Sequence, residues 1–372
     1  MKTINGHEFI QLFETFSPKK HALEGDPIGL QIGTLNKQIK TVMIALDVMP
    51  DVVEEAIENE VDLIIAHHPL IFRPLKNISS EDPSGKLIQQ LIKHDIAVYA
   101  AHTNLDVSTG GVNDMLAAAL KLNDTSVLAP TYAQQLKKLA VFVPENDEAM
   151  VLQALGNAGA GAIGEYRECS FSSVGTGRFL PGENANPHIG NQGSLASVRE
   201  VRIETVYPEE IEKKVISAML KAHPYEEPAY DLYTLDLKAE ELGLGRIGEL
   251  TEEMSLEEFA LYVKAALDSN GVRVVGNLQQ RVKKVAVLGG DGNKYMKHAK
   301  FHGADVYVTG DIYYHTAHDA MNIGLNIVDP GHNVEKVMKK GLTEVLQKMS
   351  EEKCYEVKII SSEINTNPFT FI

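Results

Sequence analysis

The sequence predicts an α/β protein in which two related βαβ half-domains form one core, with an inserted ferredoxin-like α+β domain. Apolar strand-like runs alternate with helix-like runs from Lys40 onward, and the same alternation returns near the C-terminus. The residues between the two runs have a different character. At 372 residues the chain is also too long for one ordinary core, which favours two domains.

The first run supplies three strands and three helices. Its strands are TVMIALD, DLIIAHH and IAVYAAHTNLD, and its helices are PDVVEEAIENE, KLIQQLIKHD and GGVNDMLAAALKL. The strands are almost wholly apolar, which is typical of a parallel sheet covered by helices on both faces. The second run has strands VKKVAVLGG, ADVYVTGD and LNIVDPGH, and helices NKYMKHAKFHG, HTAHDAMNIG and NVEKVMKKGLTEVLQKM.

The two runs correspond to each other. VDLIIAHHPLIF matches ADVYVTGDIYYH, and IAVYAAHTNLD matches LNIVDPGHNVE when a one-residue gap is allowed. Ligands of open α/β sheets bind beyond the carboxyl ends of the strands. We therefore expect the polar residues that follow these strands to converge on one crevice.

The central segment predicts a separate small domain. KKLAVFVPENDEAMVLQALGNAGAGAIGEY and VREVRIETVYPEEIEKKVISAMLKAHPYEEPAYDLYTLD each read as strand, helix and strand, and two such units make a ferredoxin-like domain. The connection from Ser172 to Ser197 is rich in Gly, Ser and Asn, and its length is typical of a functional or mobile loop. We place the core in residues 1–135 and 238–372, and the inserted domain in residues 136–237.

Composition and charge argue against some classes of function. Acidic residues outnumber basic ones by 51 to 35, and the net charge of -16 argues against non-specific binding of nucleic acid. Met1–Pro18 has helical periodicity and lacks the apolar core of a signal peptide, so we expect a cytoplasmic protein without membrane association. Cys169 and Cys354 are the only cysteines, so any metal must use nitrogen and oxygen ligands.

Four clusters of imidazoles and carboxylates follow four predicted strands. Each cluster alone is weak evidence, because paired histidines are commonly surface or capping residues. Together they predict one or two divalent metal ions in a shared crevice. The expected ligands are His67, His68, Asp106, His332 and Glu335. We expect four further residues to support the ligands, cap helices or contact the substrate: His102, Asp311, His315 and His318.

A mixed nitrogen and carboxylate set fits zinc, iron, manganese or cobalt better than magnesium or calcium. A metal with open coordination positions lowers the pKa of a bound water to about 7, which enables hydrolysis without a nucleophilic side chain. We expect Glu335 or His102 to assist proton transfer.

Other motifs are weaker. GLGRIG, Gly243–Gly248, spells GxGxxG, but no βαβ unit surrounds it and no phosphate-binding GxxxxGK[ST] loop is present. HPYEEPAYD could hold a further metal through His223, Glu226 and Glu227, although a proline-bounded turn is the stronger interpretation.

Several segments together resemble a known family. AHHPLIF, AHTNLD, GLGRIGEL, VAVLGGDG, ADVYVTGD and the late GH with its following glutamate are similar to those of the GTP cyclohydrolase I type 2 homologues, also called the Ngg-interacting-factor-three-like family. The similarity covers nearly the whole chain. EYRECSFSSVGTGRFLPGENANP and HPYEEPAYD resemble the extra, PII-like domain of the longer bacterial members.

The resemblance implies a site for two divalent metal ions per subunit, with zinc as the first choice and iron or manganese as alternatives. It also implies a toroidal homohexamer and hydrolytic opening of the imidazole ring of GTP, or a related reaction on a nucleotide or phosphoester. One departure is that many members space the last histidine and glutamate four apart, whereas His332 and Glu335 are three apart. Both spacings keep the two side chains on one helical face.

Two other function classes remain open. A metal-binding scaffold or regulator, with an insertion that senses a small molecule, is the main alternative to a hydrolase acting on a small-molecule substrate. A nucleic-acid-binding protein is disfavoured by the charge.

Overall fold

The computed structural model describes residues 2–372, which divide into two compact units. The core unit comprises the residues up to Tyr132 together with Leu242–Ile372, and the inserted unit comprises Ala133–Glu241. The long strands β7 (Asn123–Pro144) and β10 (Tyr230–Ser255) contribute residues to both units. Each unit has a hydrophobic core of its own.

The N-terminal sheet of the core unit has the strand order β15-β4-β5-β6-β2. Neighbours are parallel except for β2, which is antiparallel to β6. The strands are β2 (Gly29–Ile32), β4 (Thr41–Ala45), β5 (Leu63–Ala66), β6 (Ala97–Ala100) and β15 (Lys358–Ser361). Its helices are α2 (Pro50–Glu58), α3 (Pro83–Lys93), α4 (Thr103–Val107) and α5 (Val112–Ala119).

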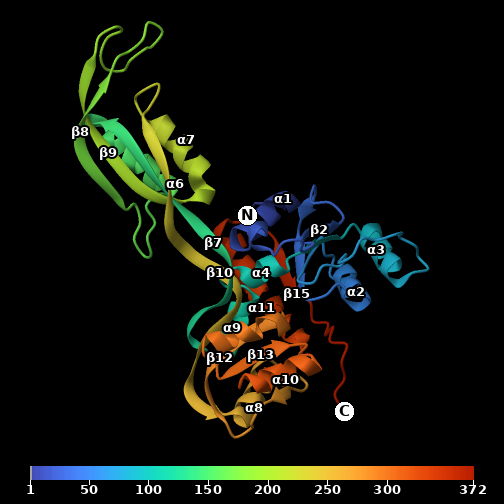
Figure 1. Ribbon diagram of the computed structural model, residues 1–372. Coiled ribbons are helices and arrows are strands. Elements are labelled where there is room, and N and C mark those ends of the chain that lie inside the picture. Colours follow the sequence, from blue (N-terminus) through green and yellow to red (C-terminus); the bar gives the residue numbers. More distant parts are fainter. Residues whose placement is uncertain (1) are drawn as a thin grey trace. The chain divides into compact units, whose positions relative to one another are not determined.

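The C-terminal sheet has the order β11-β14-β13-β12-β10 within the core unit. Strands β12, β13 and β14 are parallel, and the flanking strands β10 and β11 are antiparallel to their neighbours. Its strands, coloured orange in Figure 1, are β11 (Arg273–Val275), β12 (Arg281–Asp291), β13 (Val306–Gly310) and β14 (Asn326–Asp329). Its helices are α8 (Leu256–Ala266), α9 (Met296–Phe301), α10 (Tyr314–Asn322), the 3-10 helix η5 (His332–Lys336) and α11 (Val337–Glu352).

The central strands of both sheets bury both faces. Val42 and Ile44 of β4 join the largest apolar cluster, whereas Met43, between them, packs into a cluster on the opposite face. Alternate residues of a strand point to opposite faces, so a strand covered on both sides must be apolar throughout. The largest cluster also contains Val285 of β12 and Leu342 of α11, so it joins the two sheets into one core.

Local sequence signals set several helix boundaries. The N-terminal helix α1 (Gly6–Phe16) begins at a capping box between Asn5 and Glu8, and α8 begins at a second one between Ser255 and Glu258. Such a cap stabilises a helix by about 1 kcal/mol. Helices α2 and α3 begin at prolines, which are tolerated there because the first helical N–H groups need no partner within the helix.

The inserted unit is an antiparallel sheet with two helices. Its strand order is β7-β9-β8, with β8 (Ser170–Phe179) and β9 (Ala196–Pro208). Helices α6 (Glu148–Ala158) and α7 (Glu212–Ala222) pack on this sheet around a separate apolar cluster (Figure 1).

Two details of the inserted unit differ from the sequence prediction. GAIGEY, expected as a strand, holds only an isolated bridge between Ile163 and Tyr166, because its glycines at positions 161 and 164 adopt positive φ angles. The connection expected from Ser172 instead begins as β8, which pairs along its full length with β9. Exposed residues on both faces of β8 hid this strand from pattern analysis.

Within residues 2–372, no helix combines the length and apolar character needed to cross a membrane.

Candidate metal centre

The candidate ligands follow the carboxyl ends of three parallel strands of the core unit. His67 and His68 come directly after β5, and His102 caps the short helix α4 that follows β6. Asp106 lies within α4. The remaining two, His332 and Glu335, lie in η5 after β14. Strands β5 and β6 end at the same edge of the N-terminal sheet, and β14 belongs to the C-terminal sheet. The apolar cluster shared by the two sheets holds them together, which explains how residues more than 260 positions apart become neighbours.

The imidazole Nε2 atoms and two carboxylates meet at short distances. Glu335 Oε2 lies 3.1 Å from His68 Nε2 and 3.2 Å from His332 Nε2, and these two nitrogens are 3.2 Å apart. His67 Nε2 lies 3.6 Å from an oxygen of Asp106 and 3.7 Å from Glu335 Oε2. Ligands bound about 2.0–2.1 Å from a tetrahedral zinc ion are separated by roughly 3.3 Å, so the spacing fits ligands of a common cation.

Each histidine is oriented by a hydrogen bond at its other ring nitrogen. The Nδ1 atom of His68 lies 2.7 Å from Asp47, that of His102 lies 2.8 Å from Asp26, and that of His332 lies 2.7 Å from Asp311. The Nδ1 atom of His67 lies 3.0 Å from the carbonyl oxygen of Ala101. Each partner is an acceptor and fixes the proton on Nδ1, which leaves the Nε2 lone pair for a metal.

Three overlapping groups of side chains could each hold a metal ion. All ligand atoms within a group lie within 4.8 Å of one another. The groups share members, and Glu335 belongs to two of them. They are His67, His68 and His102; His68, His332 and Glu335; and His67, Asp106 and Glu335.

The charges of these groups are strongly coupled. Burial disfavours the charged form of His68, but hydrogen bonds to Asp47 and Glu335 outweigh it and raise the pKa to about 10. The pKa of His332 is raised to about 9 against the effect of burial, chiefly by Glu335. Burial raises the pKa of Asp106 to about 6. In Glu335 the nearby imidazoles overcome burial and hold the pKa well below its usual value.

In this arrangement protons on the imidazoles balance the negative charge of the buried carboxylates. A metal ion would replace these protons, because only a neutral imidazole coordinates a metal.

Buried polar atoms without partners support a fit to a metal. His67 is fully buried, and its Nε2 atom has no hydrogen-bond partner among the described residues. The same holds for Oδ1 of Asp106. Leaving such groups unsatisfied costs about 1–3 kcal/mol each, more when charged. A cation between these two atoms would satisfy both.

Glycines allow the backbone to approach the cluster closely. A Cβ atom on Gly290 would lie 2.8 Å from Glu335 Oε1, and one on Gly289 would lie 2.9 Å from the same oxygen. Gly290 also has a φ of +64°, which disfavours other residues. The two glycines near the end of β12 thus leave room for Glu335.

A cavity of about 530 Å³ opens onto the cluster. Its lining includes five of the six side chains, all except His67. Its wall also carries aromatic rings of Phe72 and Tyr295 and the ammonium group of Lys294. The cavity is therefore large enough to admit a small organic molecule beside the candidate ligands.

The structure brings together all five residues expected as ligands and adds His102 to them. Asp311, expected as a supporting residue, orients His332. The exposed His315 and His318 of α10 instead contact the ring of Tyr314 and belong to none of the three groups.

The weaker motifs have structural roles. Both ring nitrogens of His223 are used, because one lies 2.9 Å from the carbonyl oxygen of Phe142 and the other accepts from the N–H of Tyr225. GLGRIG lies within β10, and its Arg246 pairs with Asp114. A strand rather than a turn opening a helix excludes the dinucleotide-binding geometry for this motif.

Sequence reasoning missed two orienting carboxylates. Asp47 follows β4 at the same sheet edge as the ligands, so its position at the end of TVMIALD was a usable signal. Asp26 lies in a loop after α1 and carries no such signal.

Fold and site together define a mixed α/β protein with a candidate centre for divalent metal ions. The chain belongs to the family described as Duf34/NIF3 (NGG1p interacting factor 3), which it matches over residues 4–368. It is 63% identical to a Bacillus subtilis protein named "GTP cyclohydrolase 1 type 2 homolog" and 58% identical to one of the same name from Halalkalibacterium halodurans. Both matches cover all of each chain.

A solved structure, that of a Bacillus cereus protein related to NIF3, is similar over the full length of both chains. It has 59% sequence identity and a TM-score of 0.96.

Proposed function

We propose that this protein is a metal-dependent hydrolase whose core unit holds two divalent cations. The observation that carries the proposal is the convergence of four oriented imidazoles and two buried carboxylates from three separate segments. Structural polar networks are normally satisfied internally, whereas Nε2 of His67 and Oδ1 of Asp106 have no partner among the described residues.

Two ions are proposed because the groups overlap at Glu335. One position would use His68, His332 and Glu335, and the other His67, Asp106 and Glu335. A carboxylate has two oxygens and can bind both ions, as in many two-metal sites. The nitrogen and oxygen donors favour zinc, with iron or manganese as alternatives.

A bound divalent metal would act as a Lewis acid and lower the pKa of coordinated water. Glu335 or His102 would assist proton transfer beside the metal ions. Both belong to the groups of side chains that could hold a metal, so both lie next to the water that the metal would activate.

The cavity supports a substrate with a planar ring and an anionic group. Phe72 and Tyr295 offer surfaces for a ring, and Lys294 offers a cation for a phosphate. A nucleotide combines both features. The names of the relatives make GTP the first compound to test, with hydrolytic opening of its imidazole ring as the first reaction.

The test is hydrolysis by protein loaded with zinc, manganese or iron, against GTP and a panel of nucleotides and phosphoesters. His67→Ala and Asp106→Ala should abolish turnover, and Asp51→Ala, at an exposed position of α2, should leave it unchanged. Turnover that persists undiminished in both site variants would refute the proposal.

A non-catalytic metal-binding regulator is the second candidate, and one observation in the inserted unit favours it. A cavity of about 480 Å³ there is lined by Arg178, Arg202 and Tyr225, and the buried Nε of Arg202 has no partner among the described residues. We propose this as the place where a PII-like insertion would bind a small anionic effector. Metal binding without turnover, together with effector binding lost in Arg202→Ala, would favour this candidate.

We propose assembly as a toroidal homohexamer, which the resemblance to the Ngg-interacting-factor-three-like family implies. Light scattering should give six times the subunit mass of 40.8 kDa. A monomer or dimer at micromolar concentration would contradict it.

We also propose that the two halves of the core unit are related by duplication. Asp62, at the start of β5, accepts hydrogen bonds from the N–H groups of Lys40 and Thr41. Asp305, at the matching position before β13, accepts bonds from the N–H groups of Lys283 and Lys284. Each half also places an antiparallel strand beside its third parallel strand.

A further inference from the structure

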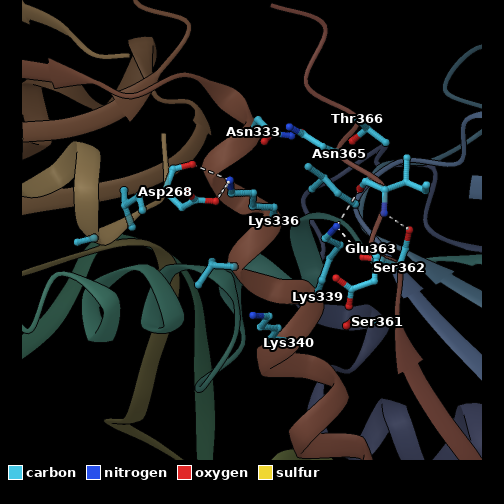
Figure 2. Close-up of a pocket in the computed structure, with 15 residues that line it drawn as sticks. Asp268, Asn333, Lys336, Lys339, Lys340, Ser361, Ser362, Glu363, Asn365 and Thr366 are labelled. Atoms are coloured by element: carbon cyan, nitrogen blue, oxygen red, sulfur yellow. Dashed lines mark hydrogen bonds and ion pairs between the residues drawn. The ribbon is translucent and has the colours of Figure 1, made fainter. Parts of the chain in front are cut away.

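A second cavity in the core unit contains none of the candidate metal ligands. It has a volume of about 390 Å³ and is lined by Leu46, by residues 266–268, by the start of α11 with the preceding Asn333 and Lys336, and by residues 361–366. Figure 2 shows Asp268 on one side of the helix and the Ser361–Thr366 segment on the other. The cavity thus extends across a helical segment that carries three lysines, from Asp268 to the Ser361–Thr366 segment.

Those lysines are Lys336, Lys339 and Lys340, and only the first is paired with a carboxylate. Lys336 Nζ lies 2.8 Å from Asp268. Lys339 donates to the carbonyl oxygens of Ser362 and Ile364 at 2.7 and 3.0 Å. Lys340 makes no hydrogen bond or ion pair with any residue in the range 2–372 for which the structure gives coordinates. Lys339 and Lys340 thus form no close ion pair with a described carboxylate, although Glu363 and Asp268 respectively are near enough to interact with their charges.

Burial also destabilises the charge of Lys339. It lowers the pKa of Lys339, although Glu363 and Glu55 oppose this shift, so the ammonium group is partly desolvated without full compensation. Once Lys336 neutralises Asp268, Glu363 is the remaining carboxylate among the lining residues, against two ammonium groups. The lining residues therefore carry one more positive than negative charge, three lysines against Asp268 and Glu363.

Side-chain amides provide further donors. Asn365 accepts from the N–H of Asn367 through its oxygen, and its amide nitrogen donates to no described residue. The side chain of Asn333 makes no hydrogen bond with the described part of the chain. Thr366, by contrast, donates its hydroxyl to Asp47 and is already used. Unused N–H donors beside unpaired ammonium groups are the chemistry that recognises a small oxyanion.

We propose that this cavity binds a small molecule bearing a phosphoryl group, held by Lys339 and Lys340 with the amides of Asn333 and Asn365. Lysine binds phosphate as a point charge. Lys336 lies three positions before Lys339 and four before Lys340, so it is a neighbour of both on the helix surface and links their positions. Neighbouring lysines and amides then contact different oxygens of the same anion. The site is independent of the metal-dependent hydrolase proposed above.

Isothermal titration calorimetry with inorganic pyrophosphate tests this site. Wild-type protein should bind one pyrophosphate per chain at saturation. Lys340→Ala should weaken binding about tenfold, because a hydrogen bond to a charged group is lost. Asn365→Ala should weaken it by a smaller factor.

Lys348→Ala is the matched control, because Lys348 is an exposed lysine of the same helix that does not line the cavity. It changes the net charge equally and should leave binding unchanged. Absence of saturable binding, or an equal loss in Lys340→Ala and Lys348→Ala, would overturn the proposal.

Phosphate also binds metal ions, so the titration is repeated in His67→Ala. Binding that persists there supports the second cavity whether or not the metal centre is catalytic. Binding that disappears in His67→Ala but survives in Lys340→Ala would assign the anion to the metal centre and overturn the proposal.

Discussion

The two halves of the core unit use matching strand ends in different ways. After its third parallel strand each half supplies an imidazole and a carboxylate, His102 and Asp106 in the N-terminal half and His332 and Glu335 in the C-terminal half. After the second strand they diverge. The N-terminal half places His67 and His68 there, whereas the matching residues of the C-terminal half are Gly310 and Asp311.

This difference shows that one half carries more ligands and the other gives them space and orientation. A Cβ atom on Gly310 would lie 2.8 Å from the backbone nitrogen of His332, so the close approach of η5 requires glycine. Asp311 holds Nδ1 of His332 instead of joining the cluster. The two halves of the core unit thus contribute unequally to one cluster of side chains.

The strongest test of this comparison removes the carboxylate that both proposed metal positions share. Glu335→Gln should abolish measurable zinc binding, because two groups lose a ligand and three imidazoles lose their anionic neighbour. Glu344→Gln, at an exposed position of the following helix α11, is the control. Zinc titration monitored by calorimetry measures both. Retention of two ions in Glu335→Gln would contradict the assignment.

Replacing an orienting carboxylate should lower metal affinity less than replacing a ligand does. The loss should be equal in the two halves. Asp47→Asn and Asp311→Asn each keep the size of the side chain but weaken the acceptor for His68 or His332. Loss of such a partner lowers metal affinity about 10–100-fold. Competition with a chromogenic chelator gives the affinities. A loss confined to one half would show that only that half forms the site.

Proton competition should make metal affinity depend on pH. The pKa of His68 is raised to about 10, so its imidazolium stabilises metal-free protein fully below its ordinary pKa of 6.5. That stabilisation is lost as the pH rises toward 10. Metal affinity should increase over the same window, since coordination requires the neutral ring. Zinc titrations in several buffers should show proton release, and an affinity independent of pH between 6 and 9 would argue against imidazole ligands.

Replacing Gly290 tests whether the cluster needs the room that this glycine leaves beside Glu335. Gly290→Ala adds a methyl group 2.8 Å from Glu335 Oε1 and also strains a backbone with φ of +64°. Gly303→Ala isolates the strain, because Gly303 has a φ of +77° and its Cβ would meet nothing within 4 Å. Both should lose about 1 kcal/mol or more of stability in thermal melts, and only Gly290→Ala should also lose metal affinity. Equal metal affinity in the two variants would show that the space is not needed.

The smallest effect on the metal centre should come from replacing the aspartate that precedes the second parallel strand of each half. Asp62→Ala and Asp305→Ala each remove an acceptor for two backbone N–H groups, which should cost about 1–2 kcal/mol of unfolding free energy without changing metal binding. Urea unfolding compares them. Markedly unequal losses would weaken the case for related halves.

The sequence predicted the parts of the structure that depend on local patterns. Continuous apolar runs such as LIIA located buried parallel strands. The capping boxes at Asn5 and Ser255 were not predicted, although they are local signals of the same kind. The direction of β5, β6 and β14 places each expected ligand at the carboxyl end of a strand. These strands belong to two sheets, and the packing of the two sheets into one core brings the ligands together.

What the sequence did not predict depends on tertiary contacts. His102 joins the ligands because Asp26, 76 positions away, fixes its ring. Strand β8 escaped detection because a solvated edge strand needs no apolar alternation and is specified by pairing with β9.

The most direct test of the central claim is anomalous diffraction at the zinc, iron and manganese absorption edges from crystals grown without added metal. The account predicts two anomalous peaks within coordination distance of His68, Asp106 and Glu335, with the shared carboxylate between them. Crystals whose fluorescence proves bound metal but whose anomalous peaks lie elsewhere, with these side chains bonded only to one another, would contradict it.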